Sequence, residues 1–222
     1  MTPQRFRTLR AALDRRQPDL TLLAENVHKP HNLSALLRTC DAVGIHEVHA
    51  VSAGGEVLRH HRVSGGSRRW LRVRVHDSIE AACLWLKRSG FQILAAHLAA
   101  PAVDFRTADY TGPSAILVGA ELAGVSAQAA TLADRQIYIP MRGVVASLNV
   151  SVAAAVVLYE AERQRQAAGL YARPRLDDDE YARTLFEWCH PRAAAACRRQ
   201  GLSYPPLDPN GQPAGNPFRR TR

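Results

Sequence analysis

Lysine is scarce in this 222-residue sequence, since only Lys29 and Lys87 occur among its 29 basic residues. The four cysteines lack C-x-x-C spacing, which disfavours a disulfide framework and a zinc site, so we expect no bound metal. The longest apolar run, 144–159, is interrupted by polar residues and is shorter than the ~20 apolar residues that a membrane span requires. The first 16 residues are charged, so we expect a cytoplasmic protein without a secretory signal.

Two nucleotide-binding fingerprints are also absent. The sequence contains neither the G-x-G-x-x-G pattern of dinucleotide-binding domains nor the lysine-bearing phosphate loop of many ATP-binding enzymes. These absences disfavour a conventional dehydrogenase and an ATP-dependent enzyme.

What the chain does have is positive charge in clusters. The formal net charge is +9 and the pI is about 10.0. Residues 1–16 hold five arginines and one acid, and residues 59–74 hold six arginines and no acid. We interpret both clusters as contacts for a polyanion, with nucleic acid favoured over a membrane surface. The alternative is an ordinary solvated surface. The candidate RNA contacts are Arg5, Arg10, Arg15, Arg16, Arg62, Arg68 and Arg69.

Strand-like and helix-like segments alternate along most of the chain. Strands are predicted at 20–27, 47–53, 71–76, 91–98, 115–119 and 136–140, and helices at 32–43, 78–88 and 148–166. This alternation indicates an α/β domain, 18–167, with a mostly parallel sheet whose ligands bind where strands end. A basic helical extension, 1–17, precedes it. A C-terminal extension, 168–222, combines short helices with a Pro- and Gly-rich tail.

The first of three candidate site segments is 28–44. Asn32 lies where a helix is predicted to begin, and its ordinary explanation is a helix cap. Arg38 follows within an otherwise apolar helical segment, and its ordinary explanation is an exposed side chain. The two positions are about 120° apart around a helix, so both could border one groove.

The second segment, LVGAELAGVS (117–126), leads from a predicted strand into Gly119, Glu121 and Gly124. Glycines at such a position allow the backbone to approach a ligand closely. Glu121 is either a functional carboxylate or a solvated turn residue.

The third segment runs from Pro140 into the helix predicted at 148–166. Helix N-termini present free N–H groups to polar or anionic ligands. We predict that Ser147 caps this helix. Asn149 is then an unfavourable interior residue, which suggests a functional role.

Together, NLSALLRTCDAVG (32–44), ILVGAELAGVS (116–126) and IPMRGVVASLNVSVA (139–153) resemble the three motifs of the SPOUT 2′-O-ribose methyltransferases. The resemblance implies a parallel α/β sheet with a deep trefoil knot, a rare exception to the rule against threaded chains. It also implies a homodimer and the cofactor S-adenosyl-L-methionine. The implied cofactor-binding residues are Ala96, His97, Gly119, Ala120, Gly124, Ile139, Met141, Gly143 and Leu148.

Segments outside the motifs are similar to the branch of the family that methylates guanosine 18 in the D-loop of tRNA. The resemblance implies that Arg38 is catalytic. We expect Arg38 to clamp a substrate phosphate and polarise the ribose hydroxyl, because its own proton is too tightly held for release. Asn32 and Glu121 are expected to orient Arg38, and Ser147 and Asn149 to shape the pocket. The alternatives are methylation of another tRNA or ribosomal RNA ribose, or a non-catalytic RNA-binding protein with the same fold.

Overall fold

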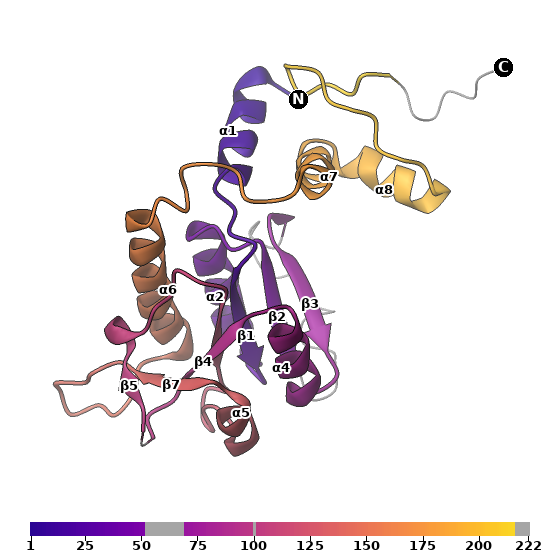
Figure 1. The fold of residues 1–222 in the computed structure, drawn as a ribbon. Helices are drawn as coiled ribbons and strands as arrows, with labels where there is room; N and C mark the ends of the chain where they lie inside the picture. The colour runs from indigo at the N-terminus through magenta and orange to yellow at the C-terminus, as the bar shows by residue number, and fades with distance from the viewer. Residues whose placement is uncertain (52–68, 100, 216–222) are drawn as a thin grey trace. The chain divides into compact units, whose positions relative to one another are not determined.

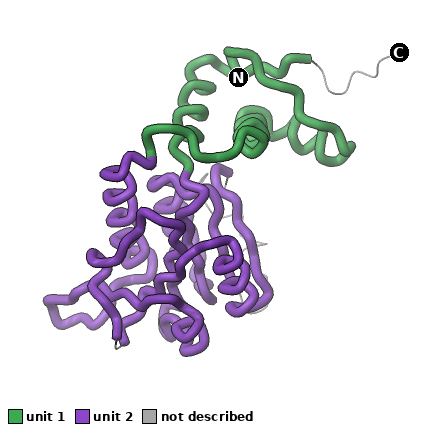
Figure 2. The backbone as a smooth tube through the Cα atoms, in the orientation of Figure 1, with its two compact units in different colours: residues 1–16, 171–222 green, residues 17–170 purple. Residues whose placement is uncertain are grey.

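The computed structural model describes residues 1–51, 69–99 and 101–215 (Figure 1). The chain forms two compact units (Figure 2): unit 1 comprises residues 1–16 and 171–222, and unit 2 comprises residues 17–170. The sequence predicted the terminal segments as two separate extensions. The structure groups them into one unit, because the first helix packs against a helix of the C-terminal segment.

Unit 2 is built on a seven-stranded sheet in the order β3-β2-β1-β6-β4-β7-β5, and all its strand pairings are parallel. This confirms the predicted α/β fold class, while the trefoil knot stays a prediction. The elements of the unit are β1 (Leu20–Glu25), α2 (Pro30–Ala42), β2 (Glu47–Val51), β3 (Arg72–His76), α4 (Ile79–Arg88), β4 (Gln92–Ala96), β5 (Val103–Asp104), the 3-10 helix η2 (Phe105–Thr107), β6 (Ser114–Val118), α5 (Ala127–Leu132), β7 (Arg135–Tyr138) and α6 (Val150–Ala167).

Helices cover both faces of this sheet. The apolar sides of α2 and α6 pack with one face, and α4 and α5 pack with the other (Figure 1). The central strands β1 and β6 are therefore buried along their whole length. This burial explains why most of their residues are apolar, as is typical of parallel sheets covered on both sides.

Two predicted helix starts are wrong. Helix α6 begins at Val150, and its N-cap is Asn149, whose Oδ1 accepts a hydrogen bond from the Ser151 N–H at 2.8 Å. Asn149 is thus a favourable cap rather than an unfavourable interior residue, and Ser147 lies outside the helix. Helix α2 begins at Pro30, so Asn32 is not a cap and its side chain is buried within the first turn.

A buried arginine joins α6 to the start of the sheet. Arg165 is fully buried; it donates hydrogen bonds to Gln17 Oε1 (3.0 Å) and to the Tyr110 carbonyl (3.0 Å), and it forms an ion pair with Asp19. Removal of one partner from such a buried pair leaves an uncompensated charge, at a typical cost of about 3–5 kcal/mol. Arg165 therefore holds the C-terminal half of α6 in place.

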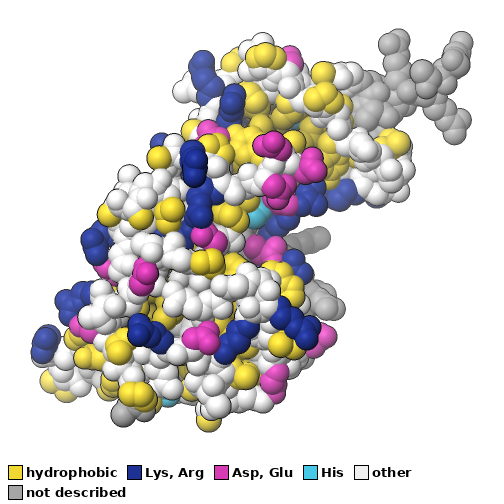
Figure 3. Space-filling model, in the orientation of Figure 1, with side chains coloured by type: hydrophobic (Ala, Val, Ile, Leu, Met, Phe, Trp, Pro, Cys, Tyr) yellow, Lys and Arg dark blue, Asp and Glu magenta, His cyan; other side chains and the backbone are white. Residues whose placement is uncertain are grey.

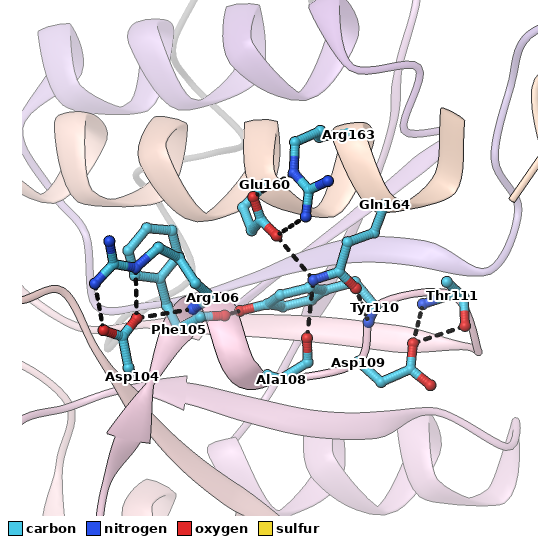
Figure 4. A network of polar contacts seen from close by, with 10 residues as sticks. All are labelled: Asp104, Phe105, Arg106, Ala108, Asp109, Tyr110, Thr111, Glu160, Arg163 and Gln164. Atoms are coloured by element: carbon cyan, nitrogen blue, oxygen red, sulfur yellow. Dashed lines mark hydrogen bonds and ion pairs between the residues drawn. The ribbon is translucent and has the colours of Figure 1, made fainter. Parts of the chain in front are cut away.

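A second set of contacts holds α6 against the segment that follows β5 (Figure 4). The Gln164 amide donates to the Ala108 carbonyl (3.0 Å), and the Tyr110 N–H donates to Gln164 Oε1 (3.0 Å). The Tyr110 hydroxyl donates to the Phe105 carbonyl at 2.7 Å, and burial raises the pKa of this phenol. Because α6 is fixed at this end, its N-terminal cap has a defined position.

Unit 1 consists of α1 (Pro3–Leu13), α7 (Asp178–Cys189) and α8 (Pro191–Gln200). Its core is small, and its buried apolar side chains include Phe6, Leu9, Leu13, Leu185, Phe186 and Trp188. None of the helices within the described ranges is long and apolar enough to cross a membrane.

Candidate cofactor and active site

A cavity of about 320 Å³ lies where β4, β6 and β7 end. Its walls are the segments that follow these strands and the first turns of α6. This is the edge at which parallel α/β sheets bind ligands, and the volume is at the lower end of the range for small-molecule sites.

Eight of the nine predicted cofactor-binding residues line this cavity. They are Ala96, His97, Gly119, Ala120, Gly124, Ile139, Met141 and Leu148. Gly143 is the exception, because it is exposed and open space surrounds it. The sequence interpretation missed the apolar side of α6, where Val150, Ala153 and Val157 also line the cavity. Their spacing of three and four residues is a helical signal that could have identified them.

The loop from Gly119 to Ser126 folds back tightly on itself. The Gly124 N–H donates to the Ala120 carbonyl at 2.8 Å, and Gly124 has a φ of +70°. A Cβ added at Gly119 would lie 2.0 Å from the backbone carbon and oxygen of Gly124. Only glycine fits at position 119, because the opposing atoms belong to the backbone and cannot turn aside.

Three polar side chains from distant segments form a hydrogen-bonded chain at the edge of the cavity. The Asn149 amide donates to Asn32 Oδ1 (3.1 Å), and the Asn32 amide donates to Glu121 Oε1 (2.9 Å). Only 6% of the Glu121 side chain is exposed, which rules out the solvated-turn alternative. Glu121 itself lines the cavity, so the chain connects the cavity wall to the cap of α6.

The hydrogen bonds keep Glu121 ionised. Burial alone would raise its pKa, but the bonds from Asn32 and from backbone N–H groups outweigh burial and lower the pKa below its ordinary value. The Lys29 N–H donates to Oε1 at 3.0 Å, and His28 Nδ1 lies 3.2 Å from Oε2. His28 and Lys29 were not identified from the sequence, where no spacing distinguishes them.

The remaining two predicted catalytic residues lie differently. Ser147 is exposed and lines the cavity. Arg38 is exposed on α2 and, within the described parts of the chain, forms no hydrogen bond or ion pair with Asn32 or Glu121. It lies six residues after Asn32, about 9 Å along the helix. Four of the five residues are therefore brought together within one chain, and Arg38 is not.

The predicted RNA contacts also separate into groups. Arg5, Arg10 and Arg15 are exposed in unit 1, and Arg69 is exposed in unit 2 with its guanidinium 4.9 Å from the Trp70 ring centre. Arg16 was predicted as an RNA contact, but it is buried. Only 2% of it is exposed, and its guanidinium lies 5.0 Å from the Trp188 ring centre, so it belongs to the interior of unit 1. Arg62 and Arg68 lie outside the described residues. On the face in Figure 3, basic side chains occur over both units, interspersed with acidic ones.

Metal-ligating side chains are not clustered in the part of the chain that the structure describes. Among those residues, no group of three His, Cys, Asp or Glu side chains is arranged to hold a metal ion. The four cysteines are buried and unpaired by disulfides.

Comparisons with known proteins identify the family. The model of the SpoU rRNA Methylase family matches residues 19–159, and the SpoU rRNA methylase C-terminal model matches residues 163–213. A tRNA (guanosine(18)-2′-O)-methyltransferase of Thermus thermophilus is 57% identical over 187 residues, covering 84% of this chain and 96% of that protein. The protein with the same activity in Escherichia coli is 50% identical, covering 96% of this chain and 93% of its own.

Solved structures of related enzymes are also similar to this chain. The crystal structure of the A. aeolicus TrmH/SpoU tRNA modifying enzyme has a TM-score of 0.78 and 42% identity, covering 83% of this chain and 94% of that chain. The AdoMet-bound rRNA methyltransferase of Sinorhizobium meliloti has a TM-score of 0.60 and 31% identity, covering 70% of this chain and 59% of that chain. The likeness to the first structure spans almost the whole of that protein.

Proposed function

Because this chain belongs to the SpoU methylase family, we propose that it is an S-adenosyl-L-methionine-dependent 2′-O-methyltransferase whose substrate is the ribose of guanosine 18 in tRNA. The observation that carries this proposal is the 50–57% identity, over most of both chains, to relatives that bear this activity in their names. The cavity supports it, because eight of the expected cofactor-binding residues surround one space. The proposed substrate also implies a cytoplasmic protein.

The residues around the cavity fit the cofactor. Gly119 lets the loop fold closely enough to form one wall, and Val150, Ala153 and Val157 provide an apolar wall of the kind that an adenine ring favours. Ile139, Met141 and Leu148 add further apolar side chains to the lining. When bound, S-adenosyl-L-methionine supplies a methyl group already activated on a sulfonium, so the protein chiefly positions groups and assists removal of a proton.

The side chains that meet the ribose are arranged from Glu121 outward. The ionised Glu121 orients the Asn32 amide, and Asn32 in turn orients the Asn149 amide beside Ser147. We assign to Arg38 the role of holding a substrate phosphate and polarising the 2′-hydroxyl, because arginine presents a planar pair of donors and keeps its own proton. Since Arg38 does not reach Glu121 within one chain, we place it in the site of a second chain.

An exposed apolar stripe on α6 supports a homodimer. Val145, Val152 and Tyr159 are 61%, 48% and 53% exposed, respectively, and they follow one another at intervals of seven residues. In α6 this spacing places Val152 and Tyr159 on one side of the helix, with Val145 in the segment leading into it. A second copy that covers this stripe would bring its α2 close to the first copy's site.

Methyl transfer to purified tRNA and, separately, to purified ribosomal RNA tests the activity. We expect incorporation of labelled methyl groups at the 2′-oxygen of guanosine 18, located by mapping the modified ribose. Label at another ribose or only in ribosomal RNA would favour the alternative substrate, and label on a base would refute the chemistry. RNA binding without transfer would favour the non-catalytic alternative.

Arg38→Lys tests the clamp. Lysine keeps the charge but loses the two-pronged donor, so turnover should fall by about 100-fold while the cofactor Kd is unchanged. Arg88→Lys, at an exposed position on α4, is the matched control and should retain turnover. Near wild-type turnover of Arg38→Lys would refute the clamp.

Mixing two inactive variants tests whether the site needs both chains. If Arg38 acts in the partner's site, mixed dimers of Arg38→Ala and Asn149→Ala contain one complete site and recover activity. If Arg38 acts within its own chain, no mixture recovers activity. Light scattering of the wild type and of Val152→Glu, which places a charge on the exposed stripe, measures the dimer directly.

A further inference from the structure

We infer that Glu25 is a positioning residue for the loop 119–126, and that cofactor affinity depends on its carboxylate. This inference rests on the proposed function, because it takes the cavity to be the cofactor site. No motif in the sequence singled out Glu25, and its side chain does not line the cavity.

Glu25 is the last residue of β1, and it is only 3% exposed. Both of its carboxylate oxygens are used on one residue: Oε1 accepts from the Ser126 hydroxyl at 2.6 Å, and Oε2 accepts from the Ser126 N–H at 2.9 Å. Ser126 in turn caps α5, because its Oγ accepts from the Ala129 N–H at 3.1 Å. The carboxylate thus fixes the point where the loop ends and α5 begins.

The burial of Glu25 indicates that these two bonds matter. Among the described residues no basic side chain forms an ion pair with it. Burying a carboxylate away from any cation is costly unless its hydrogen bonds compensate. A shorter or apolar side chain would fill this interior position at lower cost, so packing alone does not explain a glutamate.

The segment that follows β1 holds the same loop at its other end. The Lys29 N–H and the Asn32 amide both donate to Glu121, two residues after Gly119. Loop 119–126 is therefore attached at residue 121 and again at residue 126 to a single short stretch of chain, residues 25–32. The loop also closes on itself through the hydrogen bond from the Gly124 N–H to the Ala120 carbonyl.

The backbone of this stretch is itself held in an uncommon conformation. Asn26, directly after Glu25, has a φ of +52°, in the left-handed region that non-glycine residues rarely adopt, and its N–H donates to the Val51 carbonyl at 2.9 Å. This turn separates Glu25, which points to Ser126, from Lys29, whose N–H points to Glu121. The two attachments act as one brace, and the shape of the cavity wall depends on both.

Glu25→Gln is the sharpest test, because it keeps the size of the side chain and one acceptor while removing the charge. We expect the Kd for S-adenosyl-L-methionine, measured by calorimetry without RNA, to rise about tenfold, since hydrogen bonds to charged groups are among the stronger ones. The Michaelis constant for the cofactor should rise in parallel. Turnover at saturating cofactor should stay within about twofold, because Asn32, Glu121 and Asn149 keep their contacts.

Hydrogen exchange supplies a second readout. In Glu25→Gln the amides of residues 120–126 should exchange faster, while those of α6 remain protected as in the wild type. Glu80→Gln is the matched control. Glu80 lies on α4, and its carboxylate accepts a hydrogen bond from Gln128 of α5, the helix that Ser126 caps, but Glu80 is not part of the brace. It should leave both the cofactor Kd and the exchange of residues 120–126 unchanged.

Glu25→Ala separates positioning from simple stability. It removes both acceptors, so we expect a larger loss of cofactor affinity than for glutamine, together with a lower Tm. If both variants lower Tm but keep the wild-type cofactor Kd, Glu25 is only structural and the inference is wrong. If the wild type itself binds no S-adenosyl-L-methionine, the proposed function fails first and the inference with it.

Discussion

The two units differ most in charge. Unit 1 has fourteen basic residues and seven acidic ones in its 68 residues, whereas unit 2 has fifteen basic and thirteen acidic residues in 154. Most of the net charge of +9 therefore lies in the smaller unit. The groups that surround the cavity and form the polar chain all belong to the larger one.

From this difference we expect unit 1 to carry much of the long-range attraction for RNA and unit 2 to carry the chemistry. Long-range attraction to a polyanion depends on net charge and is weakened by salt, so it needs exposed arginines but no fixed geometry. The site needs the opposite: buried or partly buried groups such as Glu121 and Asn32, held by hydrogen bonds in one arrangement. We therefore expect substitutions of the unit 1 arginines to leave the cofactor Kd unchanged, and substitutions in the loop 119–126 to change tRNA binding little.

The largest expected effect is on the proposed cofactor site of unit 2. Gly119→Ala places a methyl group 2.0 Å from the Gly124 backbone, so the loop must open and cofactor affinity should fall by about three orders of magnitude. The Kd for tRNA should change little, because the arginines of unit 1 are untouched. Gly112→Ala is the control, since open space surrounds that glycine. If Gly119→Ala binds the cofactor as tightly as the wild type does, the cavity is not the cofactor site.

The next effect concerns pH and the stability of unit 2. Burial is the main reason that the pKa of His49 falls to about 4. The neighbouring His76, whose Nε2 lies 2.9 Å from His49 Nδ1, also has a pKa lowered by burial. The unfolded chain then binds more protons than the folded one between pH 6.5 and 4. The free energy of unfolding should fall as pH falls through this window, by up to about 3 kcal/mol.

Urea unfolding at a series of pH values measures this dependence. His49→Gln should flatten the slope between pH 6.5 and 4, whereas His31→Gln, at an exposed position, should retain it. An unchanged slope in His49→Gln would mean that other groups, rather than the buried histidine, account for the acid sensitivity of unit 2.

The smallest effect is expected from the arginines of unit 1. Replacing Arg5, Arg10 and Arg15 with glutamine should weaken tRNA binding about tenfold and reduce the slope of log affinity against log salt by about 2, while the cofactor Kd stays the same. Point substitutions suit this test better than deletion of residues 1–16, because α1 supplies Phe6, Leu9 and Leu13 to the core of unit 1. An unchanged salt slope would assign the RNA contacts to unit 2.

Much of unit 2 could be predicted from the sequence. The strand positions and the parallel α/β class agree with the structure, because strand and helix periodicities are local. Eight of the nine residues predicted to bind the cofactor line one cavity, because strand ends in a parallel sheet converge. The two-residue strand β5 was missed, since a segment of this length carries almost no periodic signal. The N-cap of α6 was predicted to be Ser147 but is Asn149, and the sequence could not decide between them because both residue types are good caps.

By itself, the sequence determined the order of strands and helices, the apolar faces that must be buried, and the glycine positions at which the chain turns back on itself. These depend on neighbours within a few residues. Only the tertiary structure decided which polar groups meet: Glu25 with Ser126, Asn32 with Glu121, and Arg165 with Gln17, at separations of 101, 89 and 148 residues. A buried polar group must find a partner, but the partner is set by how the strands are ordered in space, and no local pattern contains that order.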